Sequence, residues 1–201
     1  MWDCNCNKTH YRLEEFMSKV RVNEGYELYQ IITDFGDPLE IFREGIQNSF
    51  DEDATQMYIK VYEQRKISGS SLIIDIIDNG NGLLREKIAS FFDVANSSKI
   101  TEDFVPNGKH GYKGHGSKVF FNADEVHICS KTENGDYWAV KMEKPIEQIA
   151  EKHELHYSDF MEPSELGISL PNDWVSGFCV RIIAPRYFGT QYTRFKLTIY
   201  I

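Results

Sequence analysis

The strongest constraint on the fold is a short apolar run, Leu72–Ile77, in which Asp75 is the one polar residue. A run of this length that is rich in isoleucine predicts a strand largely buried in a sheet. It ends abruptly at Asp78, and the residues that follow, Asn79-Gly80-Asn81-Gly82, have the composition of a turn. The chain is therefore predicted to hold a buried strand with a carboxylate at its end.

The remaining segments predict an α+β fold. Strands are expected at 57–62, 126–130, 137–142 and 178–183, and helices near 37–50, 83–94 and 116–122. Residues 96–115 are rich in Gly, Ser, Asn and Lys and are predicted to form a long loop. This order suits a two-layer sandwich with a mixed, mostly antiparallel sheet and helices on one face, and it lacks the alternation of a doubly wound fold.

Composition indicates a globular chain and gives no sign of a nucleic-acid-binding face. The 201 residues are 41% hydrophobic and carry a formal net charge of −9, whereas a phosphate-binding surface is usually basic. The four cysteines form no regular framework, and no stretch is apolar enough for secretion or for a membrane. We expect a cytoplasmic protein, with a nuclear one not excluded, in which residues 1–35 form an arm and 36–201 one domain.

A helix start is predicted at Asp37-Pro38-Leu39-Glu40, where Asp37 can cap the helix and Glu40 can complete a capping-box-like pair. Two stripes then recur at helical spacing. The apolar stripe, expected to be buried, consists of Leu39, Phe42, Ile46 and Phe50, and the polar stripe of Glu40, Glu44, Asn48 and Asp51. The polar stripe fits a solvent-facing surface and a functional site about equally well.

Glu44 and Asn48 are four residues apart, so their side chains lie one turn apart on the same face of this helix. The amide oxygen of an asparagine suits Mg²⁺, and a carboxylate one turn away can orient and deprotonate a water near the same ion. Taken alone, a glutamate and an asparagine at this spacing are a common coincidence.

Asp78 needs hydrogen-bond donors, because it ends a buried strand and has no cation near it in the sequence. The exocyclic amine of adenine is such a donor, and Gly80 and Gly82 would let the backbone approach a flat base or turn sharply. The alternative is an ordinary turn between a strand and a helix, which the same residue types favour.

A third segment, Gly108–Lys118, places closely spaced glycines just before a predicted helix. Exposed backbone N–H groups and the helix dipole attract an anion such as phosphate, and Lys113 and Lys118 add positive charge. A flexible linker is the alternative, although a linker needs neither interleaved Lys and His nor a helix behind it. The sequence contains no G-x-x-x-x-G-K-[ST] motif, which excludes a P-loop.

In this order and spacing, the three segments resemble the motifs of the GHKL superfamily, which includes gyrase B, the heat-shock ninety chaperone, histidine kinases and MutL. The run Glu44–Thr55 looks like the first motif of the MutL and MORC branches, residues 78–82 match D-x-G-x-G, and Gly111–Gly116 matches G-x-x-G-x-G. Ser97-Ser98-Lys99 resembles the start of the ATP lid in this superfamily. The resemblance spans roughly residues 37–122, and it is the joint occurrence of the motifs that makes it specific.

The resemblance implies a Bergerat-type fold that binds ATP and Mg²⁺. Asn48 would hold the metal, Asp78 would accept from the adenine amine, and a lid at about 96–116 would close on the phosphates. Glu44 stands where histidine kinases usually have Asn, which favours hydrolysis with Glu44 as the base. The implied nucleotide-binding residues are Asn48, Asp51, Asp78, Gly80, Gly82, Leu83, Lys99, Gly111, Lys113, Gly114, His115, Gly116, Ser117 and Lys118.

The function implied is a conformational switch or clamp that dimerises with ATP and acts on DNA or protein through further segments. MutL-type members use a lysine from a following domain, for which 201 residues leave no room. The chain is therefore expected to be a fragment of a larger protein, or else to hydrolyse ATP slowly or with the help of a partner. Two positions depart from the family pattern: Glu52-Asp53 replaces the usual Ala-Gly, and Phe178 replaces the Thr that supports the adenine-site Asp. The alternatives are an ATP sensor without significant hydrolysis, a histidine-kinase-type phosphotransferase and an interaction domain with an inactive pocket.

Overall fold

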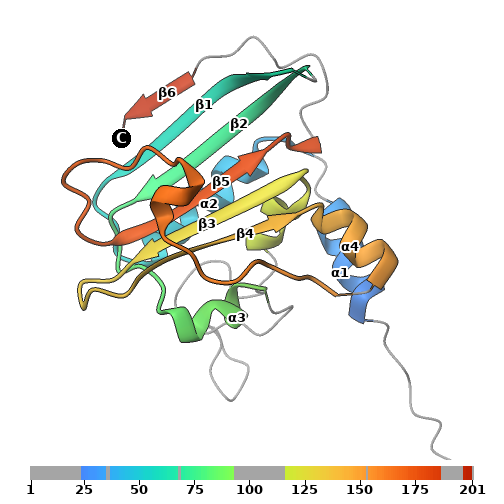
Figure 1. Ribbon diagram of the computed structural model, residues 1–201, viewed down its shortest axis with the longest axis horizontal. Helices are drawn as coiled ribbons and strands as arrows, with labels where there is room; N and C mark the ends of the chain where they lie inside the picture. Colours follow the sequence, from blue (N-terminus) through green and yellow to red (C-terminus); the bar gives the residue numbers. More distant parts are fainter. Residues whose placement is uncertain are drawn as a thin grey trace, which may run out of the picture.

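The computed structural model describes residues 24–34, 37–67, 69–92, 116–152, 154–186 and 197–200 (Figure 1). Its centre is a six-stranded sheet in the order β4-β3-β5-β2-β1-β6, in which every neighbouring pair is antiparallel. The strands are β1 (Met57–Lys66), β2 (Gly69–Asp78), β3 (Glu125–Lys131), β4 (Tyr137–Glu143), β5 (Gly177–Ile183) and β6 (Leu197–Tyr200).

The four described α-helices contribute to one hydrophobic core on one face of the sheet, with α2 behind the sheet and α1 beside α4 in Figure 1. They are α1 (Glu24–Thr33), α2 (Glu40–Asp51), α3 (Ile88–Phe92) and α4 (Pro145–Lys152), and the 3-10 helices are η2 (Arg85–Lys87), η3 (Gly116–Phe121) and η4 (Pro163–Leu166). On the opposite face, a smaller cluster around Cys129, Cys179 and Trp174 packs against Leu166 of η4. The predicted two-layer α+β sandwich with helices on one face is confirmed.

Strand alternation decides which polar groups face the helices. On β2, Ile74 and Ile76 belong to the core beneath the helices, and successive side chains of a strand point to opposite faces. Asp78, two residues after Ile76, therefore faces the helices, whereas Asp75 faces the other side. The predicted strand at 72–77 thus places its terminal carboxylate inside the sandwich rather than on its outer face.

Helix α1 lies within the stretch expected to form an arm. Leu28 and Ile32, which are four residues apart, are buried in the main core, and α1 packs against α4 and η3. Residues 1–23 of the expected arm lie outside the described residues. The helix expected from residue 116 is the 3-10 helix η3 and ends at Phe121.

The expected orientation of α2 is correct for Phe42 and Ile46, which pack against the core, and wrong for the two ends of the apolar stripe. Leu39 and Phe50 are 63% and 67% exposed, whereas Ile41, Glu44, Gly45 and Ser49 are buried. The reason is Gly45, because a Cβ at this residue would lie only 2.7 Å from the Ile76 side chain, and the helix approaches β2 at this point. Close packing at a glycine turns the polar stripe inward and leaves the ends of the apolar stripe in solvent.

Asp37 lies just before α2, whose N-cap residue is Leu39 and which has no side-chain cap, so neither the expected cap nor the capping box forms. Asp37 Oδ1 accepts a hydrogen bond from the backbone N–H of Leu39 at 2.9 Å. Glu40 instead accepts from Arg43 Nε at 2.7 Å, three residues along the helix. Glu40 therefore pairs with Arg43 instead of accepting the backbone hydrogen bond at the helix start that a capping box requires.

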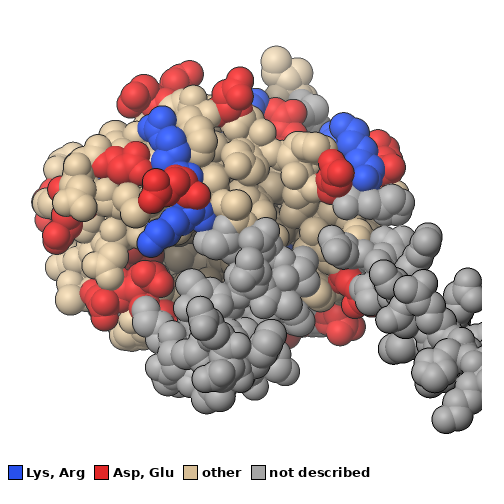
Figure 2. All heavy atoms as spheres, turned by 90° about the horizontal axis from the view of Figure 1, so that it is seen from below, with Lys and Arg blue, Asp and Glu red and all other residues tan. Residues whose placement is uncertain are grey.

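Figure 2 shows a face on which the described Lys and Arg side chains lie beside Asp and Glu rather than forming a continuous basic surface. Ion pairs account for part of this pattern, including Arg85 with Asp136 and Lys141 with Glu143. Among the described residues, no helix has the length and apolar character needed to cross a lipid bilayer.

Candidate nucleotide site

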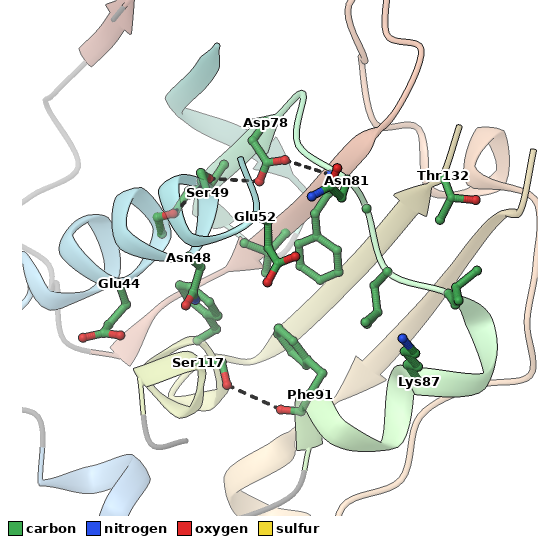
Figure 3. Close-up of a pocket in the computed structure, with 18 of the residues that line it drawn as sticks. Glu44, Asn48, Ser49, Glu52, Asp78, Asn81, Lys87, Phe91, Ser117 and Thr132 are labelled. Atoms are coloured by element: carbon green, nitrogen blue, oxygen red, sulfur yellow. Dashed lines mark hydrogen bonds between the residues drawn. The ribbon is translucent and has the colours of Figure 1, made fainter. Parts of the chain in front are cut away.

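A cavity of about 760 Å³ lies between α2, the sheet, α3 and the start of η3 (Figure 3). It brings together parts of all three sequence motifs, which are far apart along the chain. The predicted site residues that line it are Glu44, Asn48, Asp78, Gly82, Leu83, Gly116 and Ser117. Its floor is apolar and includes Ile76, Phe91, Phe120, Phe178 and Val180.

Asp78 is buried and receives three hydrogen bonds. Its Oδ2 accepts from Ser49 Oγ at 2.9 Å, and its Oδ1 accepts from the backbone N–H groups of Gly80 at 2.9 Å and Phe178 at 3.1 Å. Burial raises the pKa of Asp78, and these three donors, which stabilise the carboxylate, oppose the rise. Two donors fill Oδ1, so Oδ2 keeps the capacity to accept from one further donor.

The residues that donate hydrogen bonds to Asp78 differ from those of the family pattern, and only one of them could have been predicted from the sequence. Phe178 stands where a Thr hydroxyl was expected, and it supplies its backbone N–H instead. A hydroxyl reaches the carboxylate from the opposite side, through Ser49 of α2. Ser49 lies within the first motif and could have been singled out, whereas the Phe178 contact depends on the pairing of β2 with β5.

The strand ends around Asp78 pack too closely for side chains. Gly82 has φ +70° and Gly177 has φ +139°, and a Cβ at either would overlap a neighbouring backbone carbonyl, of Lys131 and Asp78 respectively. The Asp78 carbonyl also accepts from Trp174 Nε1 at 2.6 Å. Trp174 is 96 residues away in sequence, and no local pattern marks it as part of this support.

Leu83, predicted to line the base, is fixed through its backbone. Ser130 Oγ accepts from the Leu83 N–H at 2.7 Å and donates to its carbonyl at 3.0 Å. The same carbonyl accepts from Trp138 Nε1 at 3.0 Å. Strands β3 and β4 therefore hold this wall of the pocket in place, a role for Ser130 and Trp138 that sequence reasoning missed.

Glu44 is 5% exposed and forms an ion pair with Arg43, which also pairs with Glu40. Gly116, the last glycine of the third motif, lies directly against it, because a Cβ at Gly116 would overlap Glu44 Oε2. A side chain at residue 116 would therefore displace the Glu44 carboxylate from its present position.

Asn48 follows Glu44 by one turn on the same wall of the pocket, as Figure 3 shows. Its amide oxygen is a hard ligand, and Mg²⁺ is usually held by one or two protein oxygens together with waters and substrate phosphates. A single amide beside a cavity large enough for a triphosphate therefore fits a magnesium ion bound mainly through its nucleotide.

Other predicted residues lie around the pocket or outside the described part. Asp51 and Gly80 are buried next to it without lining it in the described part of the chain. Lys118 is 1% exposed, and its ammonium donates to the Phe91 carbonyl at 2.5 Å and to Ser117 Oγ at 3.3 Å. The predicted lid residues Lys99, Gly111, Lys113, Gly114 and His115 lie outside the described residues.

Sequence comparison agrees with the fold and with the pocket. Residues 40–167 match the family of histidine kinase-, DNA gyrase B- and HSP90-like ATPases, and the chain belongs to this family. It is 27% identical over 132 residues to the DNA mismatch repair protein MutL of Dictyoglomus turgidum, and equally so to that of Dictyoglomus thermophilum. These matches cover 65% of the chain and 21% and 20% of the two MutL proteins, so the chain spans about a fifth of their length.

Proposed function

We propose that this domain binds ATP with Mg²⁺ and hydrolyses it. The observation that carries the proposal is that Glu44, Asn48 and Asp78 line one cavity. The family match to ATPases supports the same function. The two alternative functions that bind ATP, a sensor and a phosphotransferase, differ from hydrolysis in what happens to the γ-phosphate after binding.

Adenine recognition rests on the remaining acceptor capacity of Asp78 Oδ2, which would bind the exocyclic amine. The apolar floor around Phe178 and Ile76 would bury the faces of the ring. The backbone of Leu83, held by Ser130 and Trp138, would limit the width of the base pocket. Guanine carries a carbonyl where adenine has its amine, so Asp78 would disfavour it.

Bound Mg²⁺ would neutralise part of the triphosphate charge, with Asn48 as its protein ligand. Glu44 would orient the attacking water and take its proton. Its contact with Arg43 keeps the carboxylate next to a positive charge, and the neighbouring Gly116 brings the start of η3 against it. Closure of the lid at 96–116 would exclude bulk water from this end of the pocket.

Beyond the chemistry, we propose that ATP binding favours dimerisation and that hydrolysis resets it, so that the domain acts as a switch or clamp. The matched relatives are DNA mismatch repair proteins by name. DNA or a protein client, contacted through segments other than this domain, is the corresponding partner.

Glu44→Ala tests the proposed base. The variant should bind ATP within a few-fold of wild type in calorimetric titration and lose about 10²–10⁴-fold in phosphate release, the usual contribution of a general base. Glu63→Ala, which removes an exposed carboxylate on β1, is the matched control and should keep wild-type turnover. Equal phosphate release by Glu44→Ala and wild type would refute the assignment.

A sensor without significant hydrolysis is the second candidate, and the Arg43–Glu44 ion pair favours it, because it engages the proposed base. Phosphate release by the full chain with ATP and Mg²⁺ separates the two functions. A sensor binds ATP and releases no phosphate above background. A phosphotransferase would instead leave radiolabel from γ-labelled ATP on the protein.

A further inference from the structure

Three polar residues follow one another along the pocket wall at intervals of one helical turn. Glu44, Asn48 and Glu52 are spaced by four residues, and all three line the cavity. Glu52 continues the last turn of α2, because its N–H donates to the Asn48 carbonyl at 3.1 Å. Figure 3 shows the three in this order along the pocket wall. Gly80 lies against both Glu52 and Asp78, because a Cβ there would be 2.6 Å from the Glu52 carbonyl oxygen and 3.2 Å from Asp78 Oδ1.

The position of Glu52 is fixed relative to the loop that carries Asp78. Its carbonyl accepts from the N–H of Asn81 at 3.1 Å, and Gly80 packs so closely that a Cβ there would lie 2.6 Å from the same oxygen. Asn81 Nδ2 also donates to Asp53 at 3.1 Å. These contacts join the end of α2 to residues 78–82, and the Glu52 side chain extends from this junction into the cavity.

This arrangement assigns Glu52 to the nucleoside end of a bound nucleotide. If Asp78 binds the base and Glu44 and Asn48 lie at the phosphates, the segment of ATP next to Glu52 is the ribose. A carboxylate repels phosphate but accepts charge-assisted hydrogen bonds from hydroxyl groups. Ribose offers two neighbouring hydroxyls, and acidic side chains bind them in other nucleotide sites.

We propose that Glu52 binds the ribose hydroxyls and makes the pocket selective for ribonucleotides over deoxyribonucleotides. This inference rests on the proposed ATP binding. It gives a role to a residue that replaces the small, uncharged residue of the family motif, and it explains why an added negative charge is tolerated beside a polyanionic ligand.

The test is calorimetric titration of the full chain with ATP, 2′-deoxyATP and 3′-deoxyATP in the presence of Mg²⁺. Wild type should bind ATP about tenfold more tightly than at least one deoxy analogue, the size expected of a hydrogen bond to a charged group. Glu52→Ala should bind ATP only as tightly as that analogue, with the affinity for the analogue unchanged. Glu63→Ala, which removes an exposed carboxylate on β1 outside the cavity, should keep the preference.

Two results would overturn the inference alone: equal binding of ATP and both deoxy analogues by wild type, or a Glu52→Ala variant in which all three affinities shift by the same factor. The second result would mean that Glu52 acts only through general repulsion. A wild-type chain that binds none of the three nucleotides would contradict the proposed ATP function, and the ribose assignment with it.

Discussion

Asp78 holds a carboxyl group in a position where burial and hydrogen bonding act in opposite directions. Desolvation disfavours its charged form, while Ser49 and two backbone N–H groups favour it. An asparagine fits the same surroundings, because its oxygen can accept from Gly80 and Phe178 and its amide can donate to Ser49. The Ser49 hydroxyl can then donate to the Gly45 carbonyl, which lies 3.0 Å away.

Asp78→Asn should therefore fold and yet bind ATP poorly. The amide presents N–H groups toward the adenine amine, so two donors face each other, and ATP affinity should fall about ten- to a hundredfold. Calorimetric titration measures the loss. Wild-type affinity in this variant would show that Asp78 does not recognise the base.

The pH dependence of stability in wild type and in Asp78→Asn tests the raised pKa of Asp78. Because the pKa of Asp78 is raised from 3.8, the folded state holds this proton more tightly than the unfolded state. Its contribution to the free energy of unfolding is present below pH 3.8 and is lost as the pH rises through the folded-state pKa. Relative to wild type, Asp78→Asn should gain stability in urea unfolding as the pH is raised above 3.8. A constant or falling difference would contradict the raised pKa.

At the level of elements, a buried polar network holds β1, β2 and β5 together on the face away from the nucleotide pocket. Arg181 donates to Asp75 through Nε at 2.6 Å and Nη2 at 2.9 Å, and to the Tyr62 hydroxyl at 2.9 Å. Its Nη1 donates to the Leu166 carbonyl at 3.1 Å, which attaches η4 to the sheet. One side chain thus links three strands and the segment that covers them.

Arg181→Met should destabilise the domain by about 3–5 kcal/mol, because it leaves the Asp75 carboxylate buried without its cation. Urea unfolding at pH 7 measures the change. The same substitution at Arg65, an exposed position on β1, should cost less than about 0.5 kcal/mol. Similar values for the two variants would show that the network adds little to stability.

The sequence predicts the elements better than it predicts their faces. The buried run at 72–77 became the central part of β2, and the strands expected at 126–130 and 137–142 are β3 and β4 with one more residue at one or both ends. The helix expected near 37–50 is α2, which begins three residues later, at Glu40, and packs Phe42 and Ile46 on the core as expected. Leu39 and Phe50 were wrongly assigned to the buried face, because hydrophobic periodicity does not show that Gly45 packs on Ile76. The four-residue edge strand β6 was missed.

The candidate site shows the same limit. Glu44, Asn48 and Asp78 were predicted as site residues because each lies in a local motif, and the structure brings them to one cavity. Trp174 and Ser130 were missed, because their contacts with Asp78 and Leu83 depend on which distant strands are neighbours. Register between strands far apart in the chain has no local signature.

At the level of the whole molecule, ligand binding should raise the melting temperature. ATP with Mg²⁺ at a hundred times its dissociation constant stabilises the folded state by about 2.7 kcal/mol, which for a chain of this size corresponds to roughly 5–10 °C. Asp78→Asn should show little shift under the same conditions. The absence of a shift in wild type would favour an interaction domain with an inactive pocket.

Glu44 and Asn48 on α2 and Glu52 at its C-cap follow one another at intervals of four residues, so they span about 12 Å along the helix axis at 1.5 Å per residue. ADP, which lacks the γ-phosphate, would still reach Asn48 and Glu52 and would fail to reach only Glu44. The contacts of ADP and ATP with this domain would then differ only at the helical turn that carries Glu44, next to Gly116. Loss of the γ-phosphate would therefore first change the contacts of Glu44 and of the start of η3, whereas the contacts of the base would stay the same.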